Sequence, residues 1–291
     1  MKLDGRRESS NVEDRRGMSG GAKAGLGIGG IIVVALMAWM TGGNPLEAVV
    51  QQVQQNGFGG NTEVNEGQRE FTEEEQALAK FSTQILAGTE DVWTEIFKQH
   101  GAQYQNPTMV LYTDGTHTAC GQGSAAMGPF YCSGDQKLYI DLSFFTQMKR
   151  QLGVEGNTFA YAYVIAHEIG HHVENLTGTL GKAHQAMNQS DKVTANQISV
   201  RLELLADYYA GVWAHYEEQM NHSMEYGDLE KGLELAKAIG DDWLQKKAQG
   251  RATPESFTHG TSDQRKRWLK RGFETGDMRT STFSVQNYND L

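Results

Sequence analysis

Apolar side chains recur at helical spacing over most of the chain beyond residue 70. Thr72 and Glu75 form a capping-box pattern, which predicts that a helix begins at this point. Gly88 and Thr89 interrupt this helix, and Thr89 is expected to cap a second helix that ends at Gly101. The same spacing predicts further helices over residues 158–176, 190–216 and 228–249.

Short apolar runs in the first half of the chain predict strands. Met109–Tyr112 is one such run, and Lys137–Asp141 is another. The turn residues Ser133, Gly134 and Asp135 stand just before the second run. Together with the helices, these runs predict an α+β fold that is mostly helical and contains a small sheet.

Residues 24–41 are uncharged and mostly apolar. Eighteen helical residues extend about 27 Å, close to the roughly 30 Å of a bilayer core. A cleaved signal peptide would have a shorter start and an Ala-x-Ala site, whereas 23 residues precede this run and no such site follows it. A buried helix of a soluble domain would have polar positions on one face, and the run has none. We therefore expect a single transmembrane helix.

Lysine and arginine are distributed unevenly around this segment. Six precede it and none occurs in residues 42–68, so the N-terminus is expected in the cytoplasm and the bulk of the chain outside it. Gly25 and Gly29 form a small-xxx-small pair through which two anchors could self-associate. The predicted organisation is a cytoplasmic basic tail (1–23), a transmembrane anchor (24–41), a flexible linker (42–71), a folded domain (72–275) and a C-terminal tail (276–291).

Composition excludes several classes of function. The net charge of −10 argues against nucleic acid as a partner. The locally basic stretch 265–271 is interrupted by Trp268 and Leu269, which favours the polar side of a short amphipathic helix. Two cysteines, Cys120 and Cys132, are too few for a zinc ribbon. If the domain lies outside the cytoplasm, these two should form a disulfide.

The clearest chemical signal is an H-E-x-x-H motif, His167 to His171, inside the predicted helix 158–176. Positions i and i+4 of a helix lie about 40° apart around the axis, so both imidazoles project from one face. They can supply two ligands of a tetrahedral zinc ion, and Glu168 beside them can accept a proton from water. Two exposed histidines are the alternative, but the residues before the motif are apolar, and a buried pair without a metal would need other partners.

A third ligand is predicted on the next helix, where Glu203 and Asp207 share a face. Without the histidine motif, these two residues would be interpreted as a solvated acidic pair. Beside the histidine motif, Glu203 is expected to bind the metal and Asp207 to orient a ligand imidazole. Two histidines and one glutamate leave a fourth position open, which is typical of a catalytic zinc ion. Glu174 is the alternative third ligand should Glu203 not bind.

The other histidines carry weaker signals. His172 points away from the ligand face and is expected either to support a ligand from behind or to be structural. His184, His215 and His222 belong to no recognisable pattern. His259 follows the helices and has two interpretations, a hydrogen-bond donor to the transition state or a residue of a turn.

Several segments resemble the YpfJ-like neutral zinc metallopeptidase family. They are Gly5–Ser9, Gly128–Cys132, Ala166–Val173, Glu203–Trp213 and Phe257–Gly260, so the resemblance spans nearly the whole chain. Two positions depart from the family pattern: Tyr208 stands where a cysteine is expected, and Ser133 stands where a proline is expected.

The resemblance implies a zincin-like metallopeptidase domain with one catalytic Zn²⁺ and a glutamate ligand, behind a single-pass anchor. The expected location is the bacterial inner (cytoplasmic) membrane, with the catalytic domain in the periplasm and the lipid bilayer as a partner. Because Tyr208 replaces a cysteine, Cys120 and Cys132 are the only possible disulfide pair.

The expected function is endopeptidase activity on protein or peptide substrates. Water activated by zinc would attack a peptide carbonyl, Glu168 would act as the general base, and His259 is a candidate for stabilising the oxyanion. An extended substrate is expected to pair with 137–141 or with 121–131. The alternative is a membrane-tethered zinc-binding scaffold or adaptor that cleaves nothing, although such a protein would not need Glu168.

Overall fold

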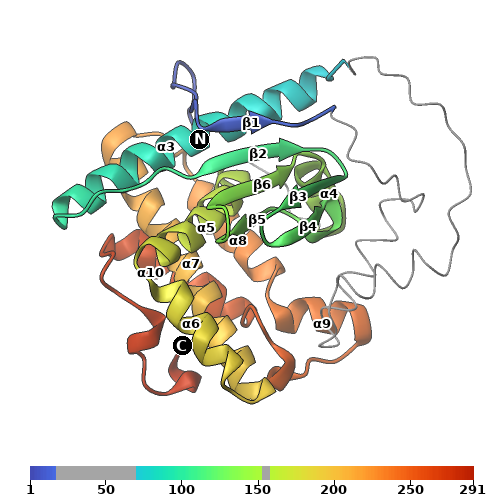
Figure 1. The fold of residues 1–291 in the computed structure, drawn as a ribbon, viewed down its shortest axis with the longest axis vertical. Helices are drawn as coiled ribbons and strands as arrows, with labels where there is room; N and C mark the ends of the chain where they lie inside the picture. Colours follow the sequence, from blue (N-terminus) through green and yellow to red (C-terminus); the bar gives the residue numbers. More distant parts are fainter. Residues whose placement is uncertain (18–69, 153–157) are drawn as a thin grey trace, which may run out of the picture.

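A computed structural model describes residues 1–17, 70–152 and 158–291 of the protein (Figure 1). A four-stranded sheet has the order β1-β2-β6-β5. Its strands are β1 (Val12–Asp14), β2 (Thr108–Tyr112), β5 (Phe130–Cys132) and β6 (Lys137–Asp141). The β1–β2 and β2–β6 pairs are parallel, whereas β5 and β6 are antiparallel. The sheet is therefore mixed, and β5 is one of its two edge strands.

A small hairpin stands beside this sheet. It consists of β3 (Gly115–Thr118) and β4 (Gly121–Ser124), which pair antiparallel. Cys120, in the turn between them, is joined by a disulfide to Cys132 at the end of β5, with an S–S distance of 2.06 Å. This is the pair expected from the sequence, and it ties the hairpin to the edge strand.

Helices form the larger part of the described fold. They are α3 (Glu73–Gln99), α4 (Ser143–Leu152), α5 (Thr158–Leu176), α6 (Thr179–Asn188), α7 (Lys192–Asn221), α8 (Asp228–Ala238), α9 (Asp241–Gln249) and α10 (Ser262–Thr275). Helix α7 packs against α3, α5, α6 and α10, and α3 runs along the side of the molecule that carries β1 and β2 (Figure 1). The predicted α+β class, mostly helical with a small sheet, is confirmed for the described residues.

Several predicted elements are present as expected. The strands at 109–112 and 137–141 are β2 and β6, and the helix at 158–176 is α5. The capping box at the start of α3 is also present, since the Glu75 amide donates to the Thr72 hydroxyl at 3.2 Å. These elements depend on local patterns, which a sequence displays directly.

The predicted break at Gly88 and Thr89 is wrong, because α3 continues through both residues. The Thr89 hydroxyl bonds to the Leu86 carbonyl inside the helix instead of capping a new one. A Cβ on Gly88 would lie 3.0 Å from a carboxylate oxygen of Glu217. This glycine therefore serves a close approach to α7 and does not end the helix.

The predicted helix at 228–249 is also wrong as a single element. It divides into α8 and α9, with the break before Gly240. A Cβ on Gly240 would lie 2.3 Å from the amide nitrogen of Ser262, so only glycine lets the start of α10 approach this point. The helix predicted at 190–216 is α7, which begins after the N-cap Asp191 and continues to Asn221.

Residues at both ends of the sequence pack onto the domain. Residues 12–14, within the predicted tail 1–23, form β1. In the predicted tail 276–291, the carbonyl of Val285 accepts a hydrogen bond from Arg201 of α7 at 2.9 Å. The predicted anchor 24–41 and most of the predicted linker lie outside the described residues. Among the described helices, none has the length and apolar character needed to cross a bilayer.

The centre of the fold is the crossing of α5 and α7. Here a Cβ on Gly170 would lie 2.8 Å from the Cα and carbonyl oxygen of Ala206. A side chain at this position is therefore incompatible with the observed distance between the two helices. Gly170 is one of the two unspecified positions of the H-E-x-x-H motif, and here its role is to allow close helix packing.

We predict that Gly170→Ala destabilises the protein by about 1–3 kcal/mol, as overpacking does. Gly181→Ala is the matched control, because nothing lies within 4 Å of that exposed helical position. The control should be neutral, or stabilising by up to about 1 kcal/mol, since alanine favours helix more than glycine does. Denaturant unfolding of both variants measures the effect, and equal stabilities would contradict the assigned packing role.

Candidate metal centre

Helix α5 carries both histidines of the motif on one face. Their ring centroids are 4.9 Å apart. Ile165, Ala166 and Ile169 around them are buried on several sides of the helix, so α5 lies inside the fold and the histidines project into its interior. His167 is 7% exposed, as expected for a buried motif.

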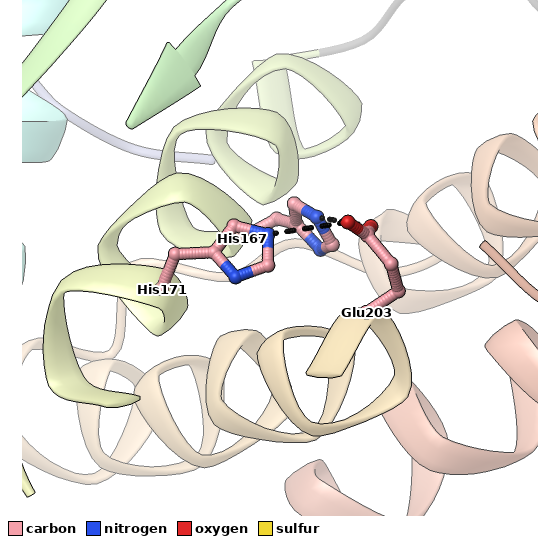
Figure 2. A group of neighbouring side chains, drawn as sticks. All are labelled: His167, His171 and Glu203. Atoms are coloured by element: carbon pink, nitrogen blue, oxygen red, sulfur yellow. Dashed lines mark ion pairs between the residues drawn. The ribbon is translucent and has the colours of Figure 1, made fainter. Parts of the chain in front are cut away.

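Helix α7 places Glu203 opposite the two histidines, as Figure 2 shows. One Glu203 oxygen lies 3.2 Å from Nε2 of His167, and the other lies 3.6 Å from Nε2 of His171. One ligand atom from each of the three residues lies within 4.8 Å of the other two. Among the described residues, this is the group of histidine, cysteine and acidic side chains whose geometry could hold a metal ion.

Asp207, one turn after Glu203, holds His167 in place. The Nδ1 atom of His167 lies 2.8 Å from Oδ1 of Asp207. Since a carboxylate only accepts, Nδ1 donates, which leaves Nε2 as the ring nitrogen that faces Glu203. Burial raises the pKa of Asp207, but Arg265 and His167 outweigh it and lower that pKa to about 2. Asp207 is therefore an anion that orients the imidazole of His167.

Arg265 completes this arrangement from α10. Its Nε donates to Oδ2 of Asp207 at 2.8 Å, and its Nη2 donates to Oδ1 at 2.9 Å. Tyr163 adds a third donor to Asp207 at 2.5 Å. Arg265 is buried, whereas Lys266 and Arg267 are exposed. The prediction that the basic residues of 265–271 form the polar side of a helix is therefore wrong for Arg265.

Glu174 orients the imidazole of His171, as Asp207 orients that of His167. Its Oε2 accepts a hydrogen bond from Nδ1 of His171 at 2.9 Å. Glu174 is fully buried, and burial raises its pKa to about 7 in spite of the neighbouring His171. The proposed ligand set therefore keeps Glu203, and Glu174 orients an imidazole. The i, i+3 spacing of the pair is the sequence signal that would have identified it.

The charges around the histidines favour a cation. Burial lowers the pKa of His167, but Asp207 and Glu203 outweigh it and raise the value to about 10. For His171 the same balance, with Glu174 and Glu203 as the anions, raises the pKa to about 9. A site that attracts protons this strongly offers the same negative potential to a metal ion. Two Nε2 atoms and a carboxylate are also the donor types that zinc prefers.

Glu168 follows His167 in α5, is half-buried, and is not a member of the ligand group. Burial raises the pKa of Glu168, while His167 and His171 act in the opposite direction. A backbone hydrogen bond from Tyr131, on edge strand β5, favours the charged form. The candidate base is thus connected to the edge of the sheet, through residues too far apart in sequence for a local pattern to display the link.

His259 reaches the site from the loop before α10. Its Nε2 lies 3.7 Å from Oε1 of Glu203. Asp241 shapes this loop, because its Oδ2 accepts backbone hydrogen bonds from Thr258, His259 and Gly260 at 2.8, 2.7 and 3.1 Å. Burial lowers the pKa of His259, against the opposing effect of Glu203. The structure thus brings His259 to the cluster, on a loop that an aspartate holds.

His172 has a structural position, as expected. Its Nε2 lies 2.7 Å from the Gln105 carbonyl and therefore donates, and its Nδ1 accepts from the hydroxyl of Tyr131 at 2.9 Å. The side chain thereby connects α5 with β5. His184, His215 and His222 are not members of the metal-binding group.

Comparisons with known proteins agree with this geometry. The family model described as "Putative neutral zinc metallopeptidase" matches residues 1–283. The uncharacterized protein YpfJ of Escherichia coli (strain K12) is 46% identical over 286 residues, which cover 95% of this chain and 96% of that protein. The uncharacterized protein Mb2605 of Mycobacterium bovis is 42% identical over 192 residues, 62% of this chain and 64% of its own length. No solved structure matches.

We predict one zinc ion per chain, lost when His167, His171 or Glu203 is replaced by alanine. Arg265→Met should leave these ligands intact but remove both hydrogen bonds to Asp207, and should weaken zinc binding by about 10–100-fold, as changes behind a metal ligand do. Arg267→Met, at an exposed position of the same helix, is the control. Competition with a chromophoric chelator measures affinity, and equal affinity of the two variants would contradict the role of Arg265.

Proposed function

Since this chain belongs to the putative neutral zinc metallopeptidase family, we propose that it is a zinc-dependent endopeptidase. The observation that carries the proposal is the arrangement of four side chains. His167, His171 and Glu203 direct ligand atoms at one point, and Glu168 stands beside them as a carboxylate that is not needed as a ligand.

The proposed chemistry assigns separate tasks to the residues of the site. When bound, zinc supplies Lewis acidity, which brings the pKa of a ligand water toward about 7. Glu168 accepts the proton of the attacking water and donates it to the leaving amine. Burial raises the pKa of Glu168, which suits a group that must both accept and donate a proton.

His259 is proposed to donate a hydrogen bond to the oxyanion that develops on the peptide carbonyl. Its position near Glu203 and the hydrogen bonds from its loop to Asp241 support this role. A donor held in place by backbone contacts needs little reorganisation as charge develops, which makes it effective. The alternative interpretation, a turn residue, explains the loop but not the direction of the imidazole toward the metal ligands.

The proposed substrate is a protein or peptide in extended form beside β5. Within the described sheet, β5 pairs with β6 on one side and ends the strand order on the other. Its residue Tyr131 also bonds to Glu168, so a strand added at this edge would bring its peptide groups next to the base. Of the two edges considered from the sequence, this observation favours 121–131 over 137–141.

Membrane association belongs to the same proposal and is supported by the apolar sequence of residues 24–41. An extracytoplasmic location of the domain is supported by the disulfide between Cys120 and Cys132, since such bonds persist in oxidising compartments. A non-cleaving scaffold is the competing function, and the half-buried Glu168 beside the ligand cluster argues against it because a scaffold has no use for a base at this position.

We predict that Glu168→Gln preserves zinc content and thermal midpoint but lowers turnover by about 10²–10⁴-fold, the usual effect of losing a general base. Casein and candidate membrane-proximal proteins are suitable substrates. Loss of zinc together with activity would assign Glu168 a structural role. Equal turnover by parent and variant would refute the mechanism, and a parent that cleaves nothing in a broad panel would favour the scaffold.

We also predict that His259→Gln lowers kcat by about 10²–10³-fold, the usual effect of removing one oxyanion donor, and leaves zinc content unchanged. His222→Gln is the matched control, because the side chain of His222 is 83% exposed. A full measurement of kcat and KM for each variant separates the two interpretations. If His259→Gln retains the parental kcat, His259 is a residue of the turn alone.

A further inference from the structure

Residues 1–17 are part of the folded domain. Strand β1 pairs in parallel with β2, with Val12 opposite Met109 and Asp14 opposite Leu111. On either side of β1, the Met109 amide donates to the Asn11 carbonyl at 2.9 Å and the Arg15 amide donates to the Leu111 carbonyl at 2.7 Å. The segment therefore supplies a complete edge strand to the sheet that carries β5.

Two buried carboxylates of the domain have their partners in this segment. Glu90 of α3 is 3% exposed. It accepts hydrogen bonds from Ser9 at 2.6 Å, Asn11 at 2.7 Å and Arg7 at 3.0 Å. Because a buried carboxylate that loses its partners is strongly destabilising, Glu90 depends on the segment.

Glu217 of α7 is the second of these carboxylates, and it is 1% exposed. Its Oε1 accepts a hydrogen bond from Arg6 at 2.6 Å. Helices α3 and α7 thus each direct a buried acid at the same short N-terminal segment, from positions more than a hundred residues apart in the chain.

The segment also ends close to where the domain resumes. The guanidinium of Arg16 lies 4.2 Å from the ring centroid of Phe71. Its Nη1 donates to the Glu75 carbonyl at 3.1 Å. The described residues on either side of 18–69 are therefore neighbours on the fold, whereas the two ends of a single membrane crossing must be separated by about 30 Å.

The arginines of the segment have a use other than orientation in a membrane. Arg6 pairs with Glu217, Arg7 with Glu90 and Asp91, and Arg16 with Asp14. The prediction from the positive-inside rule treated these arginines as unpaired charges that keep the N-terminus in the cytoplasm. In the structure they neutralise acids of the folded unit, so their number before the apolar run does not require a cytoplasmic N-terminus.

From these contacts we propose that residues 1–17 and the metal domain occupy the same side of the membrane as one folded unit. Docking of the segment and a single crossing by the intervening chain exclude each other in one molecule. The orientation expected from the sequence, with the N-terminus in the cytoplasm and the domain outside, is the arrangement that this proposal replaces. The proposal is independent of the proposed peptidase function.

Thiol labelling of the full chain in intact cells tests the proposal. Both native cysteines are in the disulfide, and the described residues contain no free cysteine. Ser10→Cys places a thiol at an exposed position of the segment, and Ser284→Cys places one on the exposed surface of the domain. A membrane-impermeant maleimide is applied before and after permeabilisation.

The expected result is that the two thiols behave alike, either both labelled in intact cells or both labelled only after permeabilisation. Opposite behaviour, with one thiol labelled in intact cells and the other only after permeabilisation, would overturn the proposal. Neither result depends on cleavage of a substrate, so the outcome stands whether or not the protein proves to be a peptidase.

Charge exchange tests the docking contact itself. Arg6→Glu and Glu217→Arg should each lower the thermal midpoint of the purified full chain, and the double variant should recover part of the loss. Lys2→Glu makes the same change of charge at an exposed position and should have little effect. If Arg6→Glu has no larger effect than Lys2→Glu, the segment is not docked and the proposal fails.

Discussion

The carboxylate of Asp207 is the interaction on which the arrangement of the site depends. It lies on α7 and accepts hydrogen bonds from Tyr163 and His167 of α5 and from Arg265 of α10. A buried anion that joins three helices is stable only when all its donors are in place. The geometry that fixes the imidazole of His167 is therefore the same geometry that fixes how the helices cross.

Small residues make this convergence possible. A Cβ on Gly211 of α7 would lie 2.2 Å from the Leu269 carbonyl, and one on Gly272 of α10 would lie 2.0 Å from the Tyr208 carbonyl. Together with Gly170 on α5, these glycines let the helices approach until Asp207 can contact His167 and Arg265 across them. The candidate metal site is thus supported by backbone packing, which holds its side chains with little freedom.

The two sides of the fold connect through β5. Tyr131 bonds to Glu168 through its backbone and to His172 through its hydroxyl, and the disulfide at Cys132 follows directly. The opposite edge of the same sheet is β1, built from the N-terminal segment. The sheet therefore joins the N-terminal segment at one edge to the strand that contacts the candidate catalytic base at the other.

Local patterns determined much of what could be predicted for this protein. Helix α5, strands β2 and β6, and the shared face of His167 and His171 follow from periodicities of a few residues, which the chain displays without its partners. The proximity of Glu203 could be proposed from its own helix and from family resemblance. The crossing of α5 over α7 places it at 3.2 Å from His167. The burial of Arg265, the link from Tyr131 to Glu168 and the docking of β1 join residues far apart in sequence. No local pattern contains such contacts. They form only when distant helices and strands pack together, because only then is the free energy of the contact lower than that of the same groups in water.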